Sequence, residues 1–234
     1  MSNLKKSIRE KALELGVDLF GVADLNNFDT DNSKPIPKNI FDGFNRAISI
    51  AIALPKAIFM KIEKAPTPEY AKVYNTVNNK LDEISVYLSK FIENHGFKAL
   101  PIPASQIIDR ENFKGAITHK AVARLAGIGW QGKSLLIVSP EYGPRIRLAT
   151  ILTDMDIEPD NPIQNMCGSC TNCRDICPSK AIKGVSIENG YYVNREHALY
   201  FDKCKSKLID EFAKIENVGF PICGFCIKAC PYGK

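Results

Sequence analysis

The chain has 234 residues, of which 45% are hydrophobic and 24% are charged. These values exclude an extended disordered chain, because a sequence of this length and composition can bury a hydrophobic core. The formal net charge is +5, and no run of five or more Lys or Arg residues occurs. The charge pattern therefore gives no indication of a nucleic-acid-binding surface.

The N-terminus leads into an amphipathic helix, and we recognise no signal peptide and no twin-Arg motif. The longest largely apolar stretch, from Ala47 to Pro55, is too short to cross a bilayer. We therefore expect a cytoplasmic protein that has no membrane partner. In that reducing compartment, cysteines act more often as metal ligands than as disulfide partners.

Hydrophobic periodicity predicts alternating helices and strands through the first two-thirds of the chain. Leu4, Ile8 and Ala12 recur every four residues, and Gly16 stands where the resulting helix would end. The clearest helix, from Tyr70 to Ile92, has seven apolar residues at spacings of three and four. The predicted elements are helix 4–15, strand 47–54, helix 70–92, strand 97–102, helix 120–126 and strands 135–138 and 148–152. This alternation predicts a layered α/β or α+β domain.

The cysteines divide the sequence into two parts. All eight lie between Cys167 and Cys230, and residues 1–166 contain none. The preceding segment 154–162 is acidic and contains two prolines, so we interpret it as a linker. We therefore predict an α/β domain over residues 1–158 and a small cysteine-rich domain over residues 159–234.

The cysteine spacing is that of bacterial ferredoxins. A first run, C-x2-C-x2-C-x3-C-P, begins at Cys167; a second run, C-x2-C-x3-C-P, begins at Cys223; and Cys204 stands between them. Eight thiolates are the number that two [4Fe–4S] clusters require. In two-cluster ferredoxins, the last cysteine of a run ligates the other cluster. The predicted ligands are Cys167, Cys170, Cys173 and Cys230 for cluster one, and Cys177, Cys204, Cys223 and Cys226 for cluster two.

Zinc is the alternative metal, but zinc sites favour separated C-x2-C pairs with His or Cys partners. Here three cysteines share one short run that ends in Cys-Pro, and a related run follows. We therefore expect two cubane clusters in a ferredoxin-like domain, with metal binding coupled to folding. Two adjacent clusters conduct single electrons and do not themselves select a substrate.

The most distinctive segment outside the cysteines runs from Ala126 to Ser134 and contains the only Trp and three glycines. Glycines permit a cofactor to approach the backbone closely. The segment does not fit the G-x-G-x-x-G pattern of dinucleotide-binding folds. A tight helix-to-strand turn with Trp130 packed in the core explains it equally well, and the residues alone do not separate the two interpretations.

Several segments together resemble epoxyqueuosine reductase and its relatives. The segment AGIGWQGK at 126–133 is followed by LLI at 135–137, by ILTD at 151–154 and by CGSCTNCRDICPSKAI from Cys167. Cys204 within FDKC and the closing CGFCIKACPYG match the remaining cluster ligands of the family, and residues 12–23 match its first helix and strand. The resemblance therefore covers nearly the whole chain.

The resemblance implies an α/β domain similar to nitroreductase-type flavin folds that holds a cobalamin. A ferredoxin-like 2[4Fe–4S] domain would dock against it and reduce the cobalt, an arrangement that reductive dehalogenases share. By the same resemblance, the glycine segment would line the corrinoid, with its backbone facing the macrocycle. The lining residues would be Gly127, Gly129, Trp130, Gly132, Lys133 and Ser134.

The sequence departs from the family pattern at two points. The acid that family members carry shortly before this motif, as a proton donor, corresponds to Phe113-Lys114, which is not acidic. The tRNA-modifying enzymes also continue well past the second cysteine run, whereas this sequence ends three residues after Pro231. We therefore do not expect tRNA as a partner.

Other polar residues near the motif are candidate proton donors. Asp109 and His119 are the principal candidates, and Arg110, Glu111 and Lys120 lie close to them in the sequence. The alternative interpretation is a helix N-terminus with charged, solvated neighbours.

Three functions fit these observations. The first is a cobalamin-dependent reductase, which takes electrons from a low-potential donor such as ferredoxin or flavodoxin and passes them through both clusters to cobalt and a small-molecule substrate. The second is an electron-transfer or activator protein that reduces the corrinoid of a partner protein. The third replaces cobalamin with FMN in the same domain.

Overall fold

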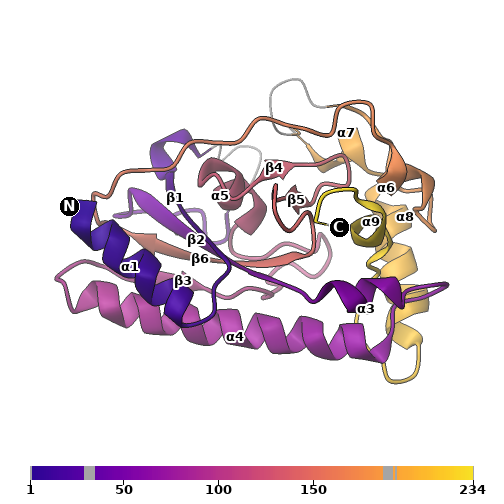
Figure 1. The fold of residues 1–234 in the computed structure, drawn as a ribbon, viewed down its shortest axis with the longest axis horizontal. Coiled ribbons are helices and arrows are strands. Elements are labelled where there is room, and N and C mark those ends of the chain that lie inside the picture. The colour runs from indigo at the N-terminus through magenta and orange to yellow at the C-terminus, as the bar shows by residue number, and fades with distance from the viewer. Residues whose placement is uncertain (1, 29–34, 187–191, 193, 234) are drawn as a thin grey trace. The chain divides into compact units, whose positions relative to one another are not determined.

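The computed structural model describes residues 2–28, 35–186, 192 and 194–233 (Figure 1). Its α-helices are α1 (Ser2–Glu14), α3 (Lys56–Met60), α4 (Pro68–Glu93), α5 (His119–Leu125), α6 (Asn172–Asp175), α7 (Arg195–Ala198), α8 (Phe201–Ser206) and α9 (Phe225–Ala229). Its strands are β1 (Leu19–Asp24), β2 (Arg46–Ala53), β3 (Ala99–Ile102), β4 (Trp130–Gln131), β5 (Ile137–Val138) and β6 (Ile146–Thr153). The remaining helical segments are the 3-10 helices η1 (Leu25–Asn27) and η3 (Phe212–Lys214) and the π-helical η2 (Lys207–Glu211). In the described part of the chain, no helix is long and apolar enough to cross a membrane.

The chain forms two compact units, each assembled from segments that are separate in the sequence. The first contains Met1–Ile52, Val77–Gly129 and Arg147–Ile163, and the second contains Ala53–Thr76, Trp130–Ile146 and Gln164–Lys234. Two segments that precede the cysteines in sequence therefore belong to the unit that contains the cysteines. The predicted division has a single boundary, between a domain of residues 1–158 and a domain of residues 159–234. This division stays a prediction.

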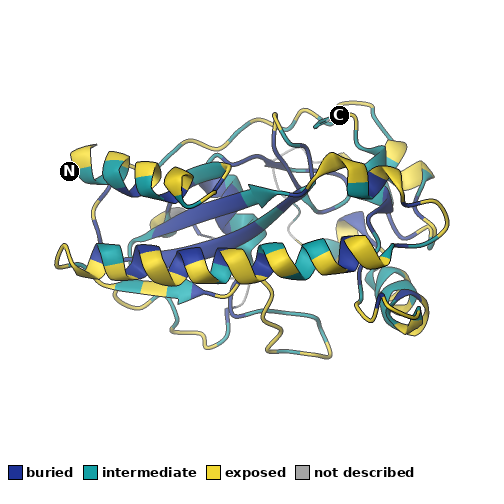
Figure 2. Ribbon diagram, turned by 60° about the horizontal axis from the view of Figure 1, so that its bottom comes forward, coloured by how far each residue is buried: buried dark blue, intermediate teal, exposed yellow. Residues whose placement is uncertain are grey.

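A four-stranded sheet in the order β1-β2-β6-β3 forms the centre of the first unit. β1 pairs antiparallel with β2, from Leu19 opposite Ala51 to Asp24 opposite Arg46, and β3 pairs antiparallel with β6. Figure 2 shows that the central strands β2 and β6 are buried along most of their length. Burial on both faces explains why β2 is a nearly continuous apolar run.

Helices cover both faces of this sheet. Ile8 of α1 and Leu88 of α4 pack with Val22 of β1 in one apolar core, so these two helices share a face of the sheet. Because successive side chains of a strand alternate, Gly21 points to the other face, where α5 ends. A Cβ atom at Gly21 would lie 2.0 Å from the carbonyl oxygen of Ala126, so glycine is required for this close approach.

The long elements predicted from periodicity are confirmed. α1 ends at Glu14, and Gly16 follows with a φ of 95°, the left-handed conformation that terminates many helices. Both α4 and β2 lie within two residues of the predicted limits. β4 is not predicted, because two residues are too short to show a periodic pattern.

The expectation of a free linker before the cysteines is wrong. Met155 and Ile157 are each 1% exposed and belong to the core of the first unit. The carboxylate of Asp160 accepts a hydrogen bond from the backbone of Val22 and forms a 2.8 Å ion pair with Lys5. The segment looks like a linker in the sequence because its two buried apolar residues are separated by an acidic residue and followed by prolines.

The second unit joins a short hairpin to several short helices. β4 and β5 pair antiparallel, with Trp130 opposite Val138. One apolar group, which includes Phe59 and Phe225, packs against Cys223, and another includes Cys177 itself. Five cysteines therefore have apolar neighbours, which limit the access of water to their sulfur atoms: Cys173, Cys177, Cys204, Cys223 and Cys226.

Candidate metal centre

The eight cysteines lie on loops and short helices of the second unit. Cys173 is in α6, Cys204 is in α8 and Cys226 is in α9, while the other five lie in adjoining loops. None forms a disulfide, and Cys177 is the most fully buried of the eight. Partly buried cysteines that form no disulfides and lie in one unit are a ligand set suited to iron.

Four of these thiols influence one another electrostatically. Burial, together with the nearby thiols of Cys167, Cys173 and Cys170, raises the pKa of Cys230 to about 11. Burial and the thiols of Cys167 and Cys170 also raise the pKa of Cys173. The fold therefore brings the last cysteine of the second run to the first three cysteines of the first run.

The other four thiols form a second group. Burial, followed by the thiols of Cys204 and Cys177, raises the pKa of Cys223 to about 11. Burial and the neighbouring thiols, Cys223 foremost, raise the pKa of Cys226 well above its usual value. Because Cys173 also acts on Cys226, the two groups lie side by side.

This grouping has the crossed form that two-cluster ferredoxins show, and the ligand assigned to each cluster stays a prediction. Thiols with raised pKa values hold their protons, so iron binding must displace those protons. Among the described residues, no three His, Cys, Asp or Glu side chains converge closely enough to hold a single metal ion. A cubane needs no such convergence, since each of its four irons takes its own thiolate.

Cys177 differs from the other thiols because donors surround its sulfur. Burial raises its pKa, but hydrogen bonds from the Ser179 hydroxyl and from nearby backbone amides lower it more, so the net shift is downward. The Ala181 amide lies 3.3 Å and the Ser179 hydroxyl 3.5 Å from the sulfur atom. These donors prepare this sulfur to act as a thiolate.

Two residues of the predicted cofactor segment contact the first cysteine run. The indole Nε1 of Trp130 donates to the sulfur of Cys167 at 3.4 Å. The Nζ of Lys133 donates to the carbonyl oxygens of Gly168 and Cys170 at 2.7 and 3.0 Å. Trp130 is 0% exposed and Lys133 is 4% exposed. Both side chains are therefore engaged with the loop that carries the first two cysteines.

Gly132, between these two residues, lies beside the same sulfur. A Cβ atom at this position would lie 3.5 Å from the sulfur of Cys167 and 2.8 Å from the side chain of Val138. The contact with the sulfur is an ordinary one, whereas the contact with Val138 of β5 is too close, so a larger residue would have to displace the Val138 side chain. The glycine therefore allows the turn after β4 to pack closely against β5.

For the remaining residues of the predicted cofactor segment, the structure shows backbone conformation, burial and one close backbone approach. Gly127 has a φ of 69°, and a Cβ atom there would lie 2.6 Å from the carbonyl oxygen of Asn161. Gly129 is buried and Ser134 is half-buried. The assignment of the six residues to a corrinoid stays a prediction.

Asp109 caps a turn of its own loop. Its carboxylate accepts hydrogen bonds from the backbone and the side chain of Asn112, both at 2.9 Å. These bonds, the backbone one first, lower the pKa of Asp109. A carboxyl group with a lowered pKa is ionised at neutral pH, whereas a general acid needs a raised one. The geometry favours a structural role, and the role of proton donor stays a prediction.

Both ring nitrogens of His119 are occupied. Nε2 donates to the Pro103 carbonyl at 2.9 Å, and Nδ1 accepts from the Thr150 hydroxyl at 2.8 Å. Burial, assisted by the charge of Arg147, lowers the pKa of His119 to about 4. The ring is therefore neutral at pH 7, and its one N–H bond is committed to Pro103. His119 as a proton donor likewise stays a prediction.

Sequence reasoning missed three residues that surround the first cysteine run. Asn165 accepts from the Cys167 amide, Tyr232 donates its hydroxyl to the Met166 carbonyl, and the ring of Tyr192 lies near the sulfurs. Burial, followed by the nearby thiols, raises the pKa of Tyr192 to about 12. Only Asn165 carried a local signal, since an Asn two residues before a turn commonly caps it.

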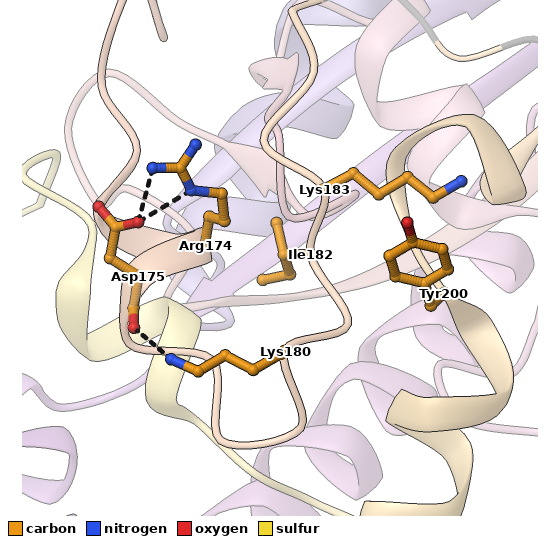
Figure 3. Close-up of a pocket in the computed structure, with 6 residues that line it drawn as sticks. All are labelled: Arg174, Asp175, Lys180, Ile182, Lys183 and Tyr200. Atoms are coloured by element: carbon orange, nitrogen blue, oxygen red, sulfur yellow. Dashed lines mark hydrogen bonds and ion pairs between the residues drawn. The ribbon is translucent and has the colours of Figure 1, made fainter.

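A basic pocket lies next to the first run in sequence. Arg174 and Asp175 fall between two cysteines and form a 2.8 Å ion pair, while Lys180 donates to the Asp175 carbonyl (Figure 3). Lys183 lies 4.5 Å from the ring centroid of Tyr200. The pocket has a volume of about 400 Å³ and is lined by Arg174, Asp175, Lys180, Ile182, Lys183 and Tyr200. Three cations against one carboxylate give it a positive charge.

Comparison with known proteins agrees with this geometry. Residues 166–233 match the family described as the 4Fe-4S double cluster binding domain. The protein therefore has an α/β region followed by a double-cluster ferredoxin domain, and its eight cysteines supply ligands for two [4Fe–4S] clusters.

The similarity extends beyond this domain. Over 213 residues the chain is 29% identical to the epoxyqueuosine reductase of Bacillus anthracis. This alignment covers 85% of this chain and 50% of that protein. The solved epoxyqueuosine reductase of Bacillus subtilis aligns over 99% of this chain and 66% of its own, at 28% identity and a TM-score of 0.65. The chain is similar to epoxyqueuosine reductases along nearly its whole length and spans about half the length of the Bacillus anthracis enzyme.

A second class of proteins shares the fold. The catabolic reductive dehalogenase NpRdhA aligns over 98% of this chain and 32% of its own, with a TM-score of 0.75 and 19% identity. At that identity the likeness concerns the fold alone.

Proposed function

We propose that the protein is an iron–sulfur reductase that passes single electrons through two [4Fe–4S] clusters to a corrinoid. Cluster one is held by Cys167, Cys170, Cys173 and Cys230, and cluster two by Cys177, Cys204, Cys223 and Cys226. The observation that carries the proposal is the crossed grouping of eight cysteines, none of them in a disulfide, in a double-cluster domain. The whole-chain similarity to epoxyqueuosine reductases supports a reductive role.

The chain itself does three things in this proposal. It brings the two groups of thiols together, which would place the two clusters near one another for electron transfer. It packs apolar groups against five of the eight cysteines, which limits side reactions with water. It places N–H and O–H donors against Cys167 and Cys177, which stabilise the negative charge of the clusters.

The corrinoid rests on resemblance. A dehalogenase with this fold is described as carrying out B12-dependent dehalogenation, and a corrinoid would supply a low-potential metal for reductive bond cleavage. The described contacts of Gly127, Trp130 and Lys133 are with protein atoms. FMN in the same region is the alternative cofactor.

One observation favours a second function, an electron relay that reduces the corrinoid of a partner protein. The two candidate proton donors, Asp109 and His119, are both committed to structural hydrogen bonds. A relay needs clusters but no proton donor and no substrate pocket of its own. Its substrate would be the oxidised cofactor of another protein.

The absorption spectrum of protein purified without oxygen separates these functions. Corrinoid bands beside the broad iron–sulfur absorption support the reductase, flavin bands support the FMN alternative, and iron–sulfur absorption alone supports the relay. If corrinoid is present, replacing Gly129 with Leu should abolish its binding and leave the iron content unchanged. Unaltered corrinoid affinity in that variant would remove the glycine segment from the cofactor site.

We also propose that the electrons come from an acidic carrier such as a ferredoxin or flavodoxin. The positive pocket at Arg174, Lys180 and Lys183 supports this partner, because opposite charges steer the encounter of redox proteins. Arg174 belongs to the segment that joins Cys173 of cluster one to Cys177 of cluster two. A carrier docked there would lie close to both clusters.

A further inference from the structure

We propose that Trp130 and Lys133 are positioning residues of cluster one, and that the indole N–H of Trp130 raises the reduction potential of that cluster through its bond to Cys167. This inference rests on the proposed ligation of cluster one by Cys167. It gives a cluster-directed role to two residues that family resemblance assigns to a corrinoid.

The indole is held in place on several sides. Trp130 pairs with Val138 across the β4–β5 hairpin, and its side chain is completely buried. The ring of Tyr232 meets it edge-on, with ring centroids 4.8 Å apart, and the hydroxyl of Tyr232 donates to the carbonyl of Met166. Because Met166 directly precedes Cys167, one set of contacts fixes both the donor and the sulfur that accepts.

The cysteine loop is fixed to the same hairpin by hydrogen bonds from side chains to backbone atoms. The side chain of Asn165 donates to the Gln131 carbonyl at 3.0 Å and accepts from the Cys167 amide at 2.9 Å. Lys133 then binds the next turn of the loop through two carbonyl oxygens, at Gly168 and Cys170. The hairpin therefore determines where two thiolates of cluster one stand.

The burial of Lys133 points to a negative charge nearby. An ammonium group that is 4% exposed and bonded to neutral carbonyls is costly, unless an anion compensates for it. A cubane with four thiolate ligands is anionic, and it becomes more so when it accepts one electron from a donor. Lys133 is thus placed to offset the charge of cluster one.

The expected effect on potential follows from the same charge. A hydrogen bond to cluster sulfur stabilises the reduced state more than the oxidised state, since the reduced state carries more negative charge. Removing the Trp130 N–H should lower the equilibrium constant for one-electron reduction of cluster one about tenfold, which corresponds to about 59 mV. Cluster two should be unaffected, because its ligand Cys177 takes hydrogen bonds from Ser179 and Ala181 instead.

The test is an anaerobic redox titration of the full chain, followed by electron paramagnetic resonance of the reduced clusters. Trp130→Phe keeps the aromatic packing against Tyr232 and removes only the donor. Since Trp130 is the only tryptophan, benzothienylalanine can replace it in a tryptophan auxotroph with almost no change of shape. Ser179→Ala is the matched control, because it removes a donor from the other cluster.

We expect both replacements of Trp130 to lower one midpoint potential and leave the other unchanged, with iron content as in the wild type. Ser179→Ala should shift the other potential, and Lys133→Met should lower the same potential as Trp130→Phe. Two unchanged potentials in the benzothienylalanine protein would overturn the role of Trp130. Wild-type protein without cubanes would instead overturn the proposed function, so the two failures are distinguishable.

Discussion

At the scale of single residues, hydrogen-bond partners decide which polar groups are available for chemistry. Trp130 and Ser179 direct hydrogen-bond donors at cysteine sulfur, whereas the Asp109 carboxylate accepts bonds within its own loop and His119 bonds to Thr150 of the sheet. A residue type and its position in sequence do not reveal these partners. For this reason the sequence predicts His119 and Asp109 as proton donors, whereas in the fold both side chains form hydrogen bonds that hold other parts of the structure.

His119 provides a prediction at this scale. Its pKa of about 4 lies below its ordinary value of 6.5, so the ring should stay neutral from about pH 8 to about pH 5.5. Proton NMR of the ring should show no titration in that range, and His119→Gln identifies the signal by its loss. Between pH 6.5 and pH 4 the His119 ring is protonated in the unfolded chain but not in the folded chain. The free energy of unfolding should therefore fall as pH drops from 6.5 toward 4. A midpoint near 6.5 for the assigned signal would contradict the lowered pKa of this ring.

At the scale of elements, periodic patterns specify the long helices and central strands, and contacts between distant segments specify the rest. The seven apolar residues of α4 and the apolar run of β2 needed no tertiary information. The packing of Met155 and Ile157 and the approach of β4 to Cys167 depend on partners that are far away in sequence. The cysteine spacing was informative because metal ligation imposes its own local pattern.

The segment after β6 offers a test of such long-range packing. Asp160→Ala removes the bonds to Val22 and Lys5 that fasten this segment to β1 and α1. Hydrogen exchange of the β1 amides, measured by mass spectrometry, should become about tenfold faster, because an unmade charged hydrogen bond is worth on the order of 1–3 kcal/mol.

Asp156→Ala is the control for this variant. Asp156 bonds to Arg46 at 2.9 Å but is 69% exposed, and exposed ion pairs contribute little. Its replacement should leave β1 exchange nearly unchanged. Equal exchange rates in the two variants would show that Asp160 does not anchor the segment.

At the scale of the whole molecule, the unit that holds the cysteines recruits segments 53–76 and 130–146 from earlier in the chain. Composition marks only the cysteine-rich segment, so the sequence could not reveal this recruitment. The second unit also presents the positive pocket, and the proposed electron flow begins there.

The pocket predicts how the protein meets its electron donor. In Lys180→Glu/Lys183→Glu protein, reduction of the clusters by an acidic ferredoxin at low salt should slow at least about tenfold, because attraction becomes repulsion. Stopped-flow bleaching of the iron–sulfur absorption measures this rate. Reduction by dithionite, a small reductant that needs no protein docking surface, should keep its wild-type rate.

Lys64→Glu serves as the control, since Lys64 is exposed and does not line the pocket. It changes the net charge in the same direction and should slow the ferredoxin reaction far less than the double variant. If one reversal at Lys64 matched the effect of the pocket reversals, overall charge rather than the pocket would govern the encounter.

The most direct measurement is the metal content of anaerobically reconstituted protein, together with electron paramagnetic resonance after reduction. The account predicts about eight irons per chain, four for each cubane, and the spectrum of two interacting reduced [4Fe–4S] clusters. Stoichiometric zinc, or reduced protein with no cubane signal, would contradict it.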